Sequence, residues 1–355
     1  MQQNRLMRRA AIYCILFVCT AMGVMLFYSA NKIIVVADVA QDEVVQTADG
    51  SSNVVENAID KSNIKIDRNS RNTGYFCIPM PENVKPEEVT IENHYVDQEL
   101  WVSIVLKEPE DQEEFYEQNS VYGNCENVLD GHFDVERKRI CLRFALTDVF
   151  EYQSVFENNT LCVKFLPPKE VYDKIVVIDP AYGAEDCGVM SEGINGKDVT
   201  LNIAKAVKTK LDETDIKVYY TRMDDSNPSD ENRVRLATAV KADMLIRIEV
   251  SSAENRGIYG TEAVYNSRFF IPDFGNVELA DLLEREVVTA ISGKANGLVE
   301  TTEADVVMNE ATVPAAAIRV GYLTNGQESV LLQREDYIER IADGICRTIQ
   351  KAYER

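Results

Sequence analysis

The sequence predicts an α/β domain with a mixed sheet flanked by helices, preceded by a small all-β sandwich domain and an N-terminal transmembrane helix. Three observations predict this order. An uncharged apolar run lies near the N-terminus, alternating β-branched segments recur over 73–168, and strand and helix patterns alternate over 172–355. A chain of 355 residues is long enough for two domains and additional segments.

The N-terminal segment predicts a membrane anchor. Three arginines precede a run without charged residues over 10–31, and such a run can cross bilayer hydrocarbon about 30 Å thick. The arginines place a tail, 1–9, in the cytoplasm, a single-pass signal-anchor, 10–32, in the cell membrane, and the bulk of the chain outside the cytoplasm. A cleaved signal peptide is the alternative, although its apolar core is usually shorter. The arginines are Arg5, Arg8 and Arg9.

The acidic balance of the chain limits its partners. The formal net charge of -22 excludes nucleic acid, because phosphate binding requires a basic surface. The same charge is typical of a protein that stays soluble outside a membrane.

Residues 73–168 predict β-structure, after a linker over 33–72 in which polar residues surround short apolar bursts. A short acidic helix is expected within 108–122, and Pro167 and Pro168 mark the boundary with the next domain. The pattern favours a small β-sandwich. Its clearest strands alternate in polarity and carry β-branched residues: 101–106, 139–144 and 160–165.

Cysteine usage permits disulfides. Of the eight cysteines, Cys14 and Cys19 lie in the predicted anchor, and the other six include no Cys-x-x-Cys pair that would predict a structural zinc site. Cys141 and Cys162 lie on two strand-like segments and are the best candidates for a disulfide, whereas buried free thiols are the alternative. The remaining cysteines are Cys77, Cys125, Cys187 and Cys346.

The succession of strands and helices over 172–355 predicts a sheet covered by helices on both faces. In such folds the functional groups lie on loops at strand ends. Strands are expected at 174–178, 217–221, 243–250, 260–265 and 315–320. Helices are expected from Val199 to Leu211, over 233–240, over 277–291, and around the amphipathic positions Ile338, Ile341, Ile345 and Ile349.

Four segments of this region carry a family resemblance. They read Ile-Asp-Pro-Ala-Tyr-Gly-Ala-Glu-Asp-Cys-Gly (178–188), Gly-Lys-Asp-Val-Thr-Leu (196–201), Leu-Ile-Arg-Ile-Glu-Val-Ser (245–251) and Pro-Ala-Ala-Ala-Ile-Arg-Val-Gly-Tyr-Leu-Thr-Asn (314–325). In this order they resemble the catalytic domain of the N-acetylmuramoyl-L-alanine amidases, zinc enzymes that act on peptidoglycan. The resemblance covers about half of the chain and implies the fold of that domain.

The same resemblance identifies four positions at which the chain departs from the family. The family binds zinc through a His, a Glu and a second His, and here Tyr182, Gly196 and Glu249 stand in those places. The catalytic Glu of the family is replaced by Arg319. No catalytic residue of the family is therefore intact at these positions.

These replacements remove the chemistry that a zinc site requires. A catalytic zinc needs about three protein ligands and an open position for water, with a carboxylate nearby to take the proton. Glycine has no side chain, and the permanent charge of arginine repels a dication. The two histidines, His94 and His132, precede 172–355, so zinc is implied by the family but no cofactor is expected here. A shifted ligand set is the alternative: Asp186, Cys187, Glu192 and Asp198.

Two of the replaced residues are expected to form an ion pair. The family positions of Glu249 and Arg319 converge on one metal, and a buried carboxylate needs a cationic partner. Tyr182 is expected to fill the space of the imidazole and the zinc, and Gly196 to serve the turn that it ends. Residues that match the scaffold of the family are expected to be structural: Asp179, Asp186 and Asn325.

The sequence therefore predicts a membrane-anchored, extracytoplasmic pseudo-amidase that binds peptidoglycan or regulates cell-wall hydrolysis. Peptidoglycan, a cell-envelope protein and the membrane are the implied partners. One alternative is an active amidase that cleaves the MurNAc–L-alanine bond with non-standard ligands. The other is a structural component of an envelope complex. In position alone, the expected β-sandwich is similar to the AMIN modules of some amidases, which help place those enzymes at the wall.

Overall fold

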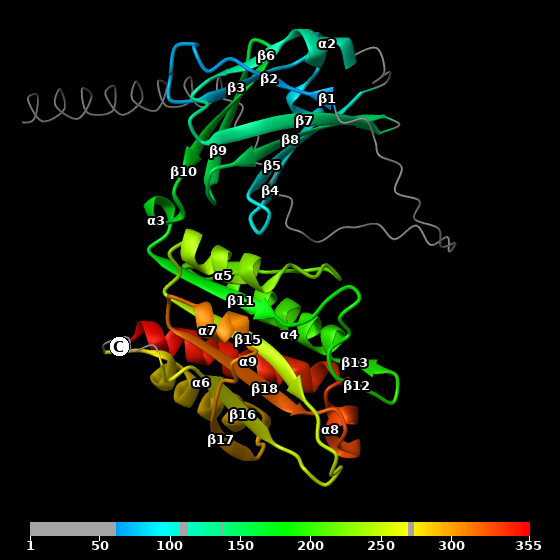
Figure 1. Cartoon of the computed structure of the whole chain (residues 1–355), viewed down its shortest axis with the longest axis vertical. Coiled ribbons are helices and arrows are strands. Elements are labelled where there is room, and N and C mark those ends of the chain that lie inside the picture. The colour runs from blue at the N-terminus through cyan, green and yellow to red at the C-terminus, as the bar shows by residue number, and fades with distance from the viewer. Residues whose placement is uncertain (1–61, 107–112, 137, 269–272) are drawn as a thin grey trace, which may run out of the picture. The chain divides into compact units, whose positions relative to one another are not determined.

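The computed structural model describes residues 62–106, 113–136, 138–268 and 273–355 (Figure 1). The expected cytoplasmic tail, the expected anchor and most of the expected linker lie outside these residues. Among the residues described, no helix is both long and apolar enough to cross a membrane. The chain divides into two compact units, one built from residues up to Phe165 and one from Leu166 to Arg355 together with 94–98 and 148–151.

The first unit consists of two five-stranded sheets. Their inner faces pack together, as the rings of Phe76 and Phe144 from different sheets show with centroids 5.0 Å apart. This arrangement is a β-sandwich. In spatial order, one sheet contains β1 (Ser62–Asn63), β7 (Val128–Glu136), β8 (Arg139–Leu146), β5 (Glu99–Val105) and β4 (Val89–His94). The other contains β2 (Lys65–Ile66), β6 (Ser120–Gly123), β3 (Phe76–Pro79), β10 (Thr160–Leu166) and β9 (Glu151–Glu157).

The helix expected over 108–122 ends earlier than the sequence pattern indicated. The described helix α2 covers Glu113–Gln118, and the chain then enters strand β6. Gly123 of β6 lies opposite Phe76 of β3, so pairing with β3 ends the helical stretch. The short helix η1 (Pro86–Glu88) belongs to this unit, whereas α3 (Pro168–Val171) lies at the start of the second unit.

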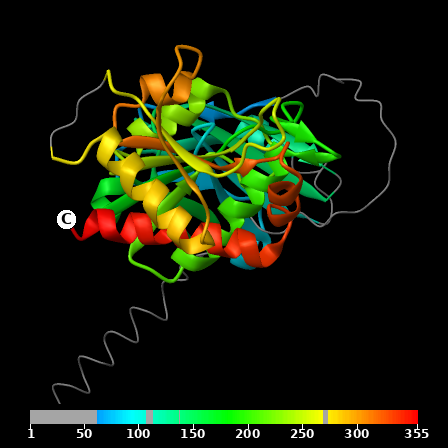
Figure 2. The ribbon, with the colours of Figure 1, turned by 90° about the horizontal axis from the view of Figure 1, so that it is seen from below.

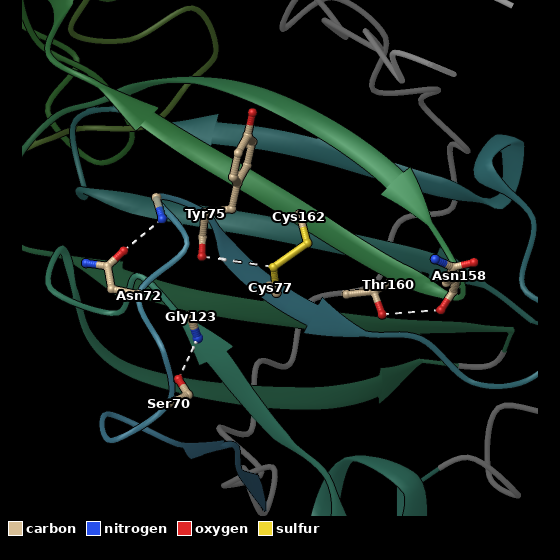
Figure 3. Close-up of a disulfide and its surroundings, with 9 residues drawn as sticks. Ser70, Asn72, Tyr75, Cys77, Gly123, Asn158, Thr160 and Cys162 are labelled. Atoms are coloured by element: carbon tan, nitrogen blue, oxygen red, sulfur yellow. Dashed lines mark hydrogen bonds between the residues drawn. A yellow bond between two sulfur atoms is a disulfide. The ribbon is translucent and has the colours of Figure 1, made fainter. Parts of the chain in front are cut away.

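The predicted disulfide pairing of Cys141 with Cys162 is wrong. Cys162 on β10 is bonded to Cys77 on β3, which lies directly opposite it in the antiparallel register (Figure 3). Cys141 lies on β8 in the other sheet and is a buried free thiol, as are Cys125 and Cys346. The correct partner follows from strand order, which the alternation of side chains along a single strand does not reveal.

The second unit contains a mixed six-stranded sheet that matches the five expected strands and adds one. Its order is β14 (Ile216–Tyr220), β11 (Lys174–Pro180), β15 (Met244–Ser251), β18 (Ala315–Tyr322), β16 (Thr261–Tyr265) and β17 (Ala295–Glu300). Strand β16 is antiparallel to β18, and the other neighbours are parallel. The added strand β17 lies at the edge and its side chains are mostly exposed, so it lacks the apolar pattern of a buried strand.

Helices cover both faces of this sheet, as expected. Along β11, Val176 and Ile178 face a core formed with α4 (Gly196–Leu211), α6 (Asn276–Ile291) and α9 (Glu335–Tyr353). Their neighbours Ile175 and Val177 face the opposite core, formed with α5 (Asp230–Ala239) and α7 (Val306–Glu310). Figure 2 shows the red α9 beside the yellow α6. Because β11, β15 and β18 are parallel, their carboxyl ends meet at one edge of the sheet, beside the hairpin of β12 (Met190–Ser191) and β13 (Ile194–Asn195) and the helix α8 (Gly326–Leu331) (Figure 1).

Candidate functional site

The predicted pair of Glu249 and Arg319 is present. The two residues lie directly opposite each other on β15 and β18. Nε of Arg319 donates to Oε2 of Glu249 over 3.0 Å, and its NH1 donates to Oε1 of Glu262 over 3.0 Å. Glu262 lies opposite Arg319 on the other side, on β16. Three neighbouring strands thus place a guanidinium between two carboxylates.

A second arginine extends this arrangement into the interior. Nε of Arg247 donates to Oε1 of Glu249 over 2.9 Å, and its NH1 donates to Oδ2 of Asp179 over 2.6 Å. The other carboxylate oxygen of Asp179 accepts a bond of 2.5 Å from Arg233 of α5. We call these six residues the ion-pair chain: Arg233, Asp179, Arg247, Glu249, Arg319 and Glu262.

The ion-pair chain is balanced, with three carboxylates and three guanidinium groups. Asp179 and Arg233 are fully buried, with side chains 0% and 1% exposed. Burial alone would raise the pKa of the Asp179 carboxyl, but Arg247 and Arg233 outweigh it and lower that pKa to about 2. Burial also opposes the charge of Arg319, and Glu249 and Glu262 outweigh this effect and raise its pKa. Asp179 and Arg319 are therefore both ionised near neutral pH.

Sequence reasoning missed three members of this chain, Arg233, Arg247 and Glu262. Arg247 precedes Glu249 by two residues on the same strand, so the alternation of side chains places both on one face of the sheet. That signal was available in the sequence. Glu262 is adjacent to Arg319 only because β16 pairs with β18, and strand order supplies that information.

Tyr182 follows β11 and adopts a left-handed backbone conformation, with φ of 69°. Its hydroxyl donates to the backbone carbonyl of Val250 over 3.5 Å. Burial, followed by the nearby charge of Glu249, raises the pKa of Tyr182 to about 12. The side chain is therefore a neutral phenol near neutral pH, whereas a metal ligand would have to be a phenolate.

Gly196 and Gly188 make room for the Tyr182 ring. A β-carbon at position 196 would lie 2.8 Å from Cγ2 of Val250 and 3.3 Å from the ring, and one at position 188 would lie 2.5 Å from the ring. Gly196 starts α4, and its N–H donates to the carbonyl of Val189. A glutamate at 196, as in the family, would collide with the packing that surrounds the tyrosine.

The residues at this place do not fit a zinc ion. Within the described ranges, no three His, Cys, Asp or Glu side chains gather closely enough to hold a metal. The alternative ligand set is not brought together either. Oδ1 of Asp186 accepts from the backbone of Gly188, Glu192 pairs with Arg256, and Asp198 accepts from Asn195.

The three residues that match the family scaffold, Asp179, Asp186 and Asn325, each form hydrogen bonds that hold neighbouring segments in place. Oδ1 of Asn325 accepts from the first backbone N–H groups of α8, so Asn325 caps that helix. Asp179 anchors the buried end of the ion-pair chain, and Thr221 donates to it over 2.5 Å. Asp186 closes the loop that carries Tyr182, through its backbone bonds with Gly183.

Comparison with known proteins agrees with this fold. The sequence matches the family model of N-acetylmuramoyl-L-alanine amidase over residues 176–351. It is 28% identical over 194 residues to the uncharacterized protein YqiI of Bacillus subtilis (strain 168), a match that covers 55% of this chain and 91% of that protein. It is 26% identical over 221 residues to the germination-specific N-acetylmuramoyl-L-alanine amidase of the same organism, covering 58% of this chain and 89% of that protein.

A solved structure extends the comparison. The N-acetylmuramoyl-L-alanine amidase from Clostridium difficile 630 is 30% identical in sequence, and the match covers 51% of this chain and 97% of that chain, with a TM-score of 0.48. The family model covers nearly all of the second unit, which spans Leu166 to Arg355 with two short additions. Through this unit the chain belongs to the N-acetylmuramoyl-L-alanine amidase family.

Proposed function

We propose that this chain is a membrane-anchored, extracytoplasmic pseudo-amidase that binds peptidoglycan or regulates its hydrolysis without cleaving it. The observation that carries the proposal is the ion-pair chain at the place where the family holds its metal. Arg319 takes the place of the catalytic carboxylate, and Glu249 is bonded to two arginines. The proposal rests on the chemistry of these groups.

Amide hydrolysis by a zinc mechanism needs a metal that lowers the pKa of a bound water, and a carboxylate that takes the proton. Arg319 keeps its proton at any ordinary pH and accepts none. Tyr182 is a neutral phenol, and Gly196 has no ligand atom. A dication placed beside Glu249 would also meet the positive charges of Arg247 and Arg319, which already neutralise that carboxylate.

Two observations support the extracytoplasmic location. The disulfide between Cys77 and Cys162 is typical of an oxidising compartment, because cytosolic thiols are kept reduced. The arginines that precede the apolar run over 10–31 favour a cytoplasmic N-terminus and an external bulk. Both features are compatible with a protein that faces the cell wall.

Metal analysis together with a cleavage assay tests the absence of activity. The full-length protein, purified without chelator, is analysed for zinc and incubated with muropeptides, and an active amidase of the family serves as the positive control. We expect far less than one zinc per chain and no release of L-alanine-linked peptide. Release of that peptide, abolished by a chelator, would instead establish an active amidase with non-standard ligands.

Co-sedimentation with purified sacculi tests the binding role. We expect the full-length protein to sediment with sacculi and not alone. Arg256 lies on the loop after β15 and its side chain is 70% exposed, so Arg256→Ala should weaken binding to a polymer that carries carboxylates. Arg285→Ala on α6, where the side chain is 57% exposed, is the matched control. Absence of sacculus binding would favour a protein partner or a structural role in an envelope complex.

A further inference from the structure

Away from the family site, one face of a sheet in the first unit carries a cluster of polar side chains, which we call the polar grid. The grid has two rows that cross three neighbouring strands, β7, β8 and β5. In the antiparallel register the rows are His132, Arg143 and Trp101, and Asp134, Cys141 and Ser103. Along β8 these positions alternate with the core residues Ile140, Leu142 and Phe144, so the grid lies on the face that points away from the core.

The polar grid is more buried than the outer face of a sandwich usually is. Asp134 is 6% exposed and Cys141 is 5% exposed. NH2 of Arg143 lies 2.9 Å from Oδ2 of Asp134, and its guanidinium stacks on the ring of Trp101 at 4.2 Å from the centroid. The arginine therefore connects the two rows and covers part of the aromatic ring.

Three polar atoms of the grid lack a hydrogen bond. They are Nε2 of His132, Oδ1 of Asp134 and Nε of Arg143, and none of them has a partner within the described part of the chain. Only one other buried side-chain atom among the described residues is in this state, the hydroxyl of Tyr220 in the second unit. A buried polar atom without a partner destabilises the fold, so three of them in one cluster indicate that an occupant supplies their bonds.

The chemistry of these atoms defines the occupant. Oδ1 of Asp134 accepts, Nε of Arg143 donates, and Nε2 of the His132 imidazole does either. The charges of Asp134 and Arg143 cancel each other, and Glu99, which accepts from Nε1 of Trp101, adds a negative charge that disfavours an anionic ligand. One hydroxyl group can donate to the carboxylate and accept from the guanidinium at the same time.

From this geometry we infer that the polar grid is a binding site for an uncharged, hydroxyl-rich ligand, that is, a saccharide. The ligand displaces the Arg143 guanidinium from the ring of Trp101, places a hydroxyl between Asp134 and Arg143, and lies against the half-buried Trp101 side chain. The inference does not rest on the proposed function, because its residues belong to the first unit and the family site belongs to the second.

Trp101 makes the inference directly testable, since it is the only tryptophan of the chain. Its fluorescence in the full-length protein is followed during titration with cellotetraose, and tetraglycine serves as a probe that offers amides but no hydroxyls. We expect a saturable change with cellotetraose, with a dissociation constant of about 1 mM or lower, and no change with tetraglycine. A response to tetraglycine alone would overturn the inference.

Substitutions in the polar grid distinguish the loss of a binding site from a general destabilisation of the sheet. Asp134→Asn should weaken cellotetraose binding about tenfold, and the exposed Asp130→Asn on the same strand should leave it unchanged. If Asp134→Asn does not fold, His132→Ala decides, with an expected weakening of about fivefold at an unchanged melting temperature. No saturable change in the wild type would leave water as the only occupant and would overturn the inference. Equal binding by the wild type and the grid variants would do the same.

Discussion

At the scale of single residues, the ring of Tyr182 rests on Gly188 and Gly196, whose missing β-carbons leave room for it. The loss of a ligand side chain at 196 and the gain of a ring at 182 are therefore sterically coupled. A side chain restored at 196 while the ring remains at 182 would crowd both Val250 and the ring. Substitutions at these two positions, 14 apart in the sequence, are therefore expected to affect stability non-additively.

Gly196→Ala should destabilise the protein by about 1–3 kcal/mol, because its new β-carbon lies 2.8 Å from Val250 and 3.3 Å from Tyr182. Urea denaturation at pH 7 measures this loss. Gly326→Ala is the matched control, since nothing lies within 4 Å of a β-carbon there. Removing the ring with Tyr182→Ala in the Gly196→Ala background should cost less than it does in the wild type. Equal costs in the two backgrounds would show that the positions are independent.

Asp179 should make the stability of the second unit depend on acid pH. Its folded pKa of about 2 lies below its ordinary value of 3.8, so its contribution is fully present above the ordinary value and is lost as pH falls through the folded one. The shift corresponds to about 2 kcal/mol. In urea denaturation between pH 2 and 7, Asp179→Asn should flatten this dependence, whereas the exposed Glu213→Gln should not. If the unfolding free energy of Asp179→Asn depended on pH as that of the wild type does, Asp179 would not be the source of the dependence.

The Asp179→Asn variant should also be less stable at neutral pH. The substitution leaves Arg233 and Arg247 buried beside a neutral amide, and breaking a buried ion pair costs about 3–5 kcal/mol. The comparison across pH therefore uses the slope of the unfolding free energy rather than its absolute value.

At the scale of elements, the sequence predicted the positions of strands more successfully than which strands pair with each other. The runs at 174–178 and 315–320 are strongly apolar and became the buried strands β11 and β18. Strand β17 was missed because an exposed edge strand needs no apolar alternation. Pairing partners were missed for a related reason, since Cys77 and Cys162 are 85 residues apart and meet only through the register of β3 with β10.

The disulfide should be a major source of stability for the first unit. A crosslink that closes a loop of this length restricts the unfolded chain and contributes about 4 kcal/mol. Replacing both Cys77 and Cys162 with Ser should lower the melting temperature of the first unit in a thermal scan without reductant. Cys187→Ser, a half-buried free thiol in the second unit, is the control. An unchanged melting temperature in the double variant would contradict a stabilising role.

At the scale of the whole molecule, the family resemblance predicted the fold of the second unit and the pairing of Glu249 with Arg319. It did not predict that Arg247 belongs to the ion-pair chain. The comparison of motifs considers only the three ligand positions and the catalytic position of the family. The ion-pair chain therefore contains a second guanidinium at Glu249, that of Arg247, beside that of Arg319. Its charge balance depends on a residue that no family ligand occupies.

This difference leads to a prediction about rebuilding a metal site. Four substitutions restore the family's residues: Tyr182→His, Gly196→Glu, Glu249→His and Arg319→Glu. They leave Arg247 in place without its partner Glu249, and the guanidinium then repels a dication at short range. Adding Arg247→Gln, which keeps a donor for Asp179, should strengthen zinc binding at least about tenfold over the four-site variant, measured by competition with a chelating dye.

The control for the rebuilt site adds Arg285→Gln to the same four substitutions. Arg285 is also an arginine, but it is exposed on α6 and pairs with Asp281 of the same helix. Its removal changes the net charge equally and should leave zinc affinity unchanged. Equal affinities for the two five-site variants would mean that Arg247 does not oppose the metal. A difference confined to Arg247→Gln, at matched melting temperatures, would locate the barrier to metal binding in that one guanidinium.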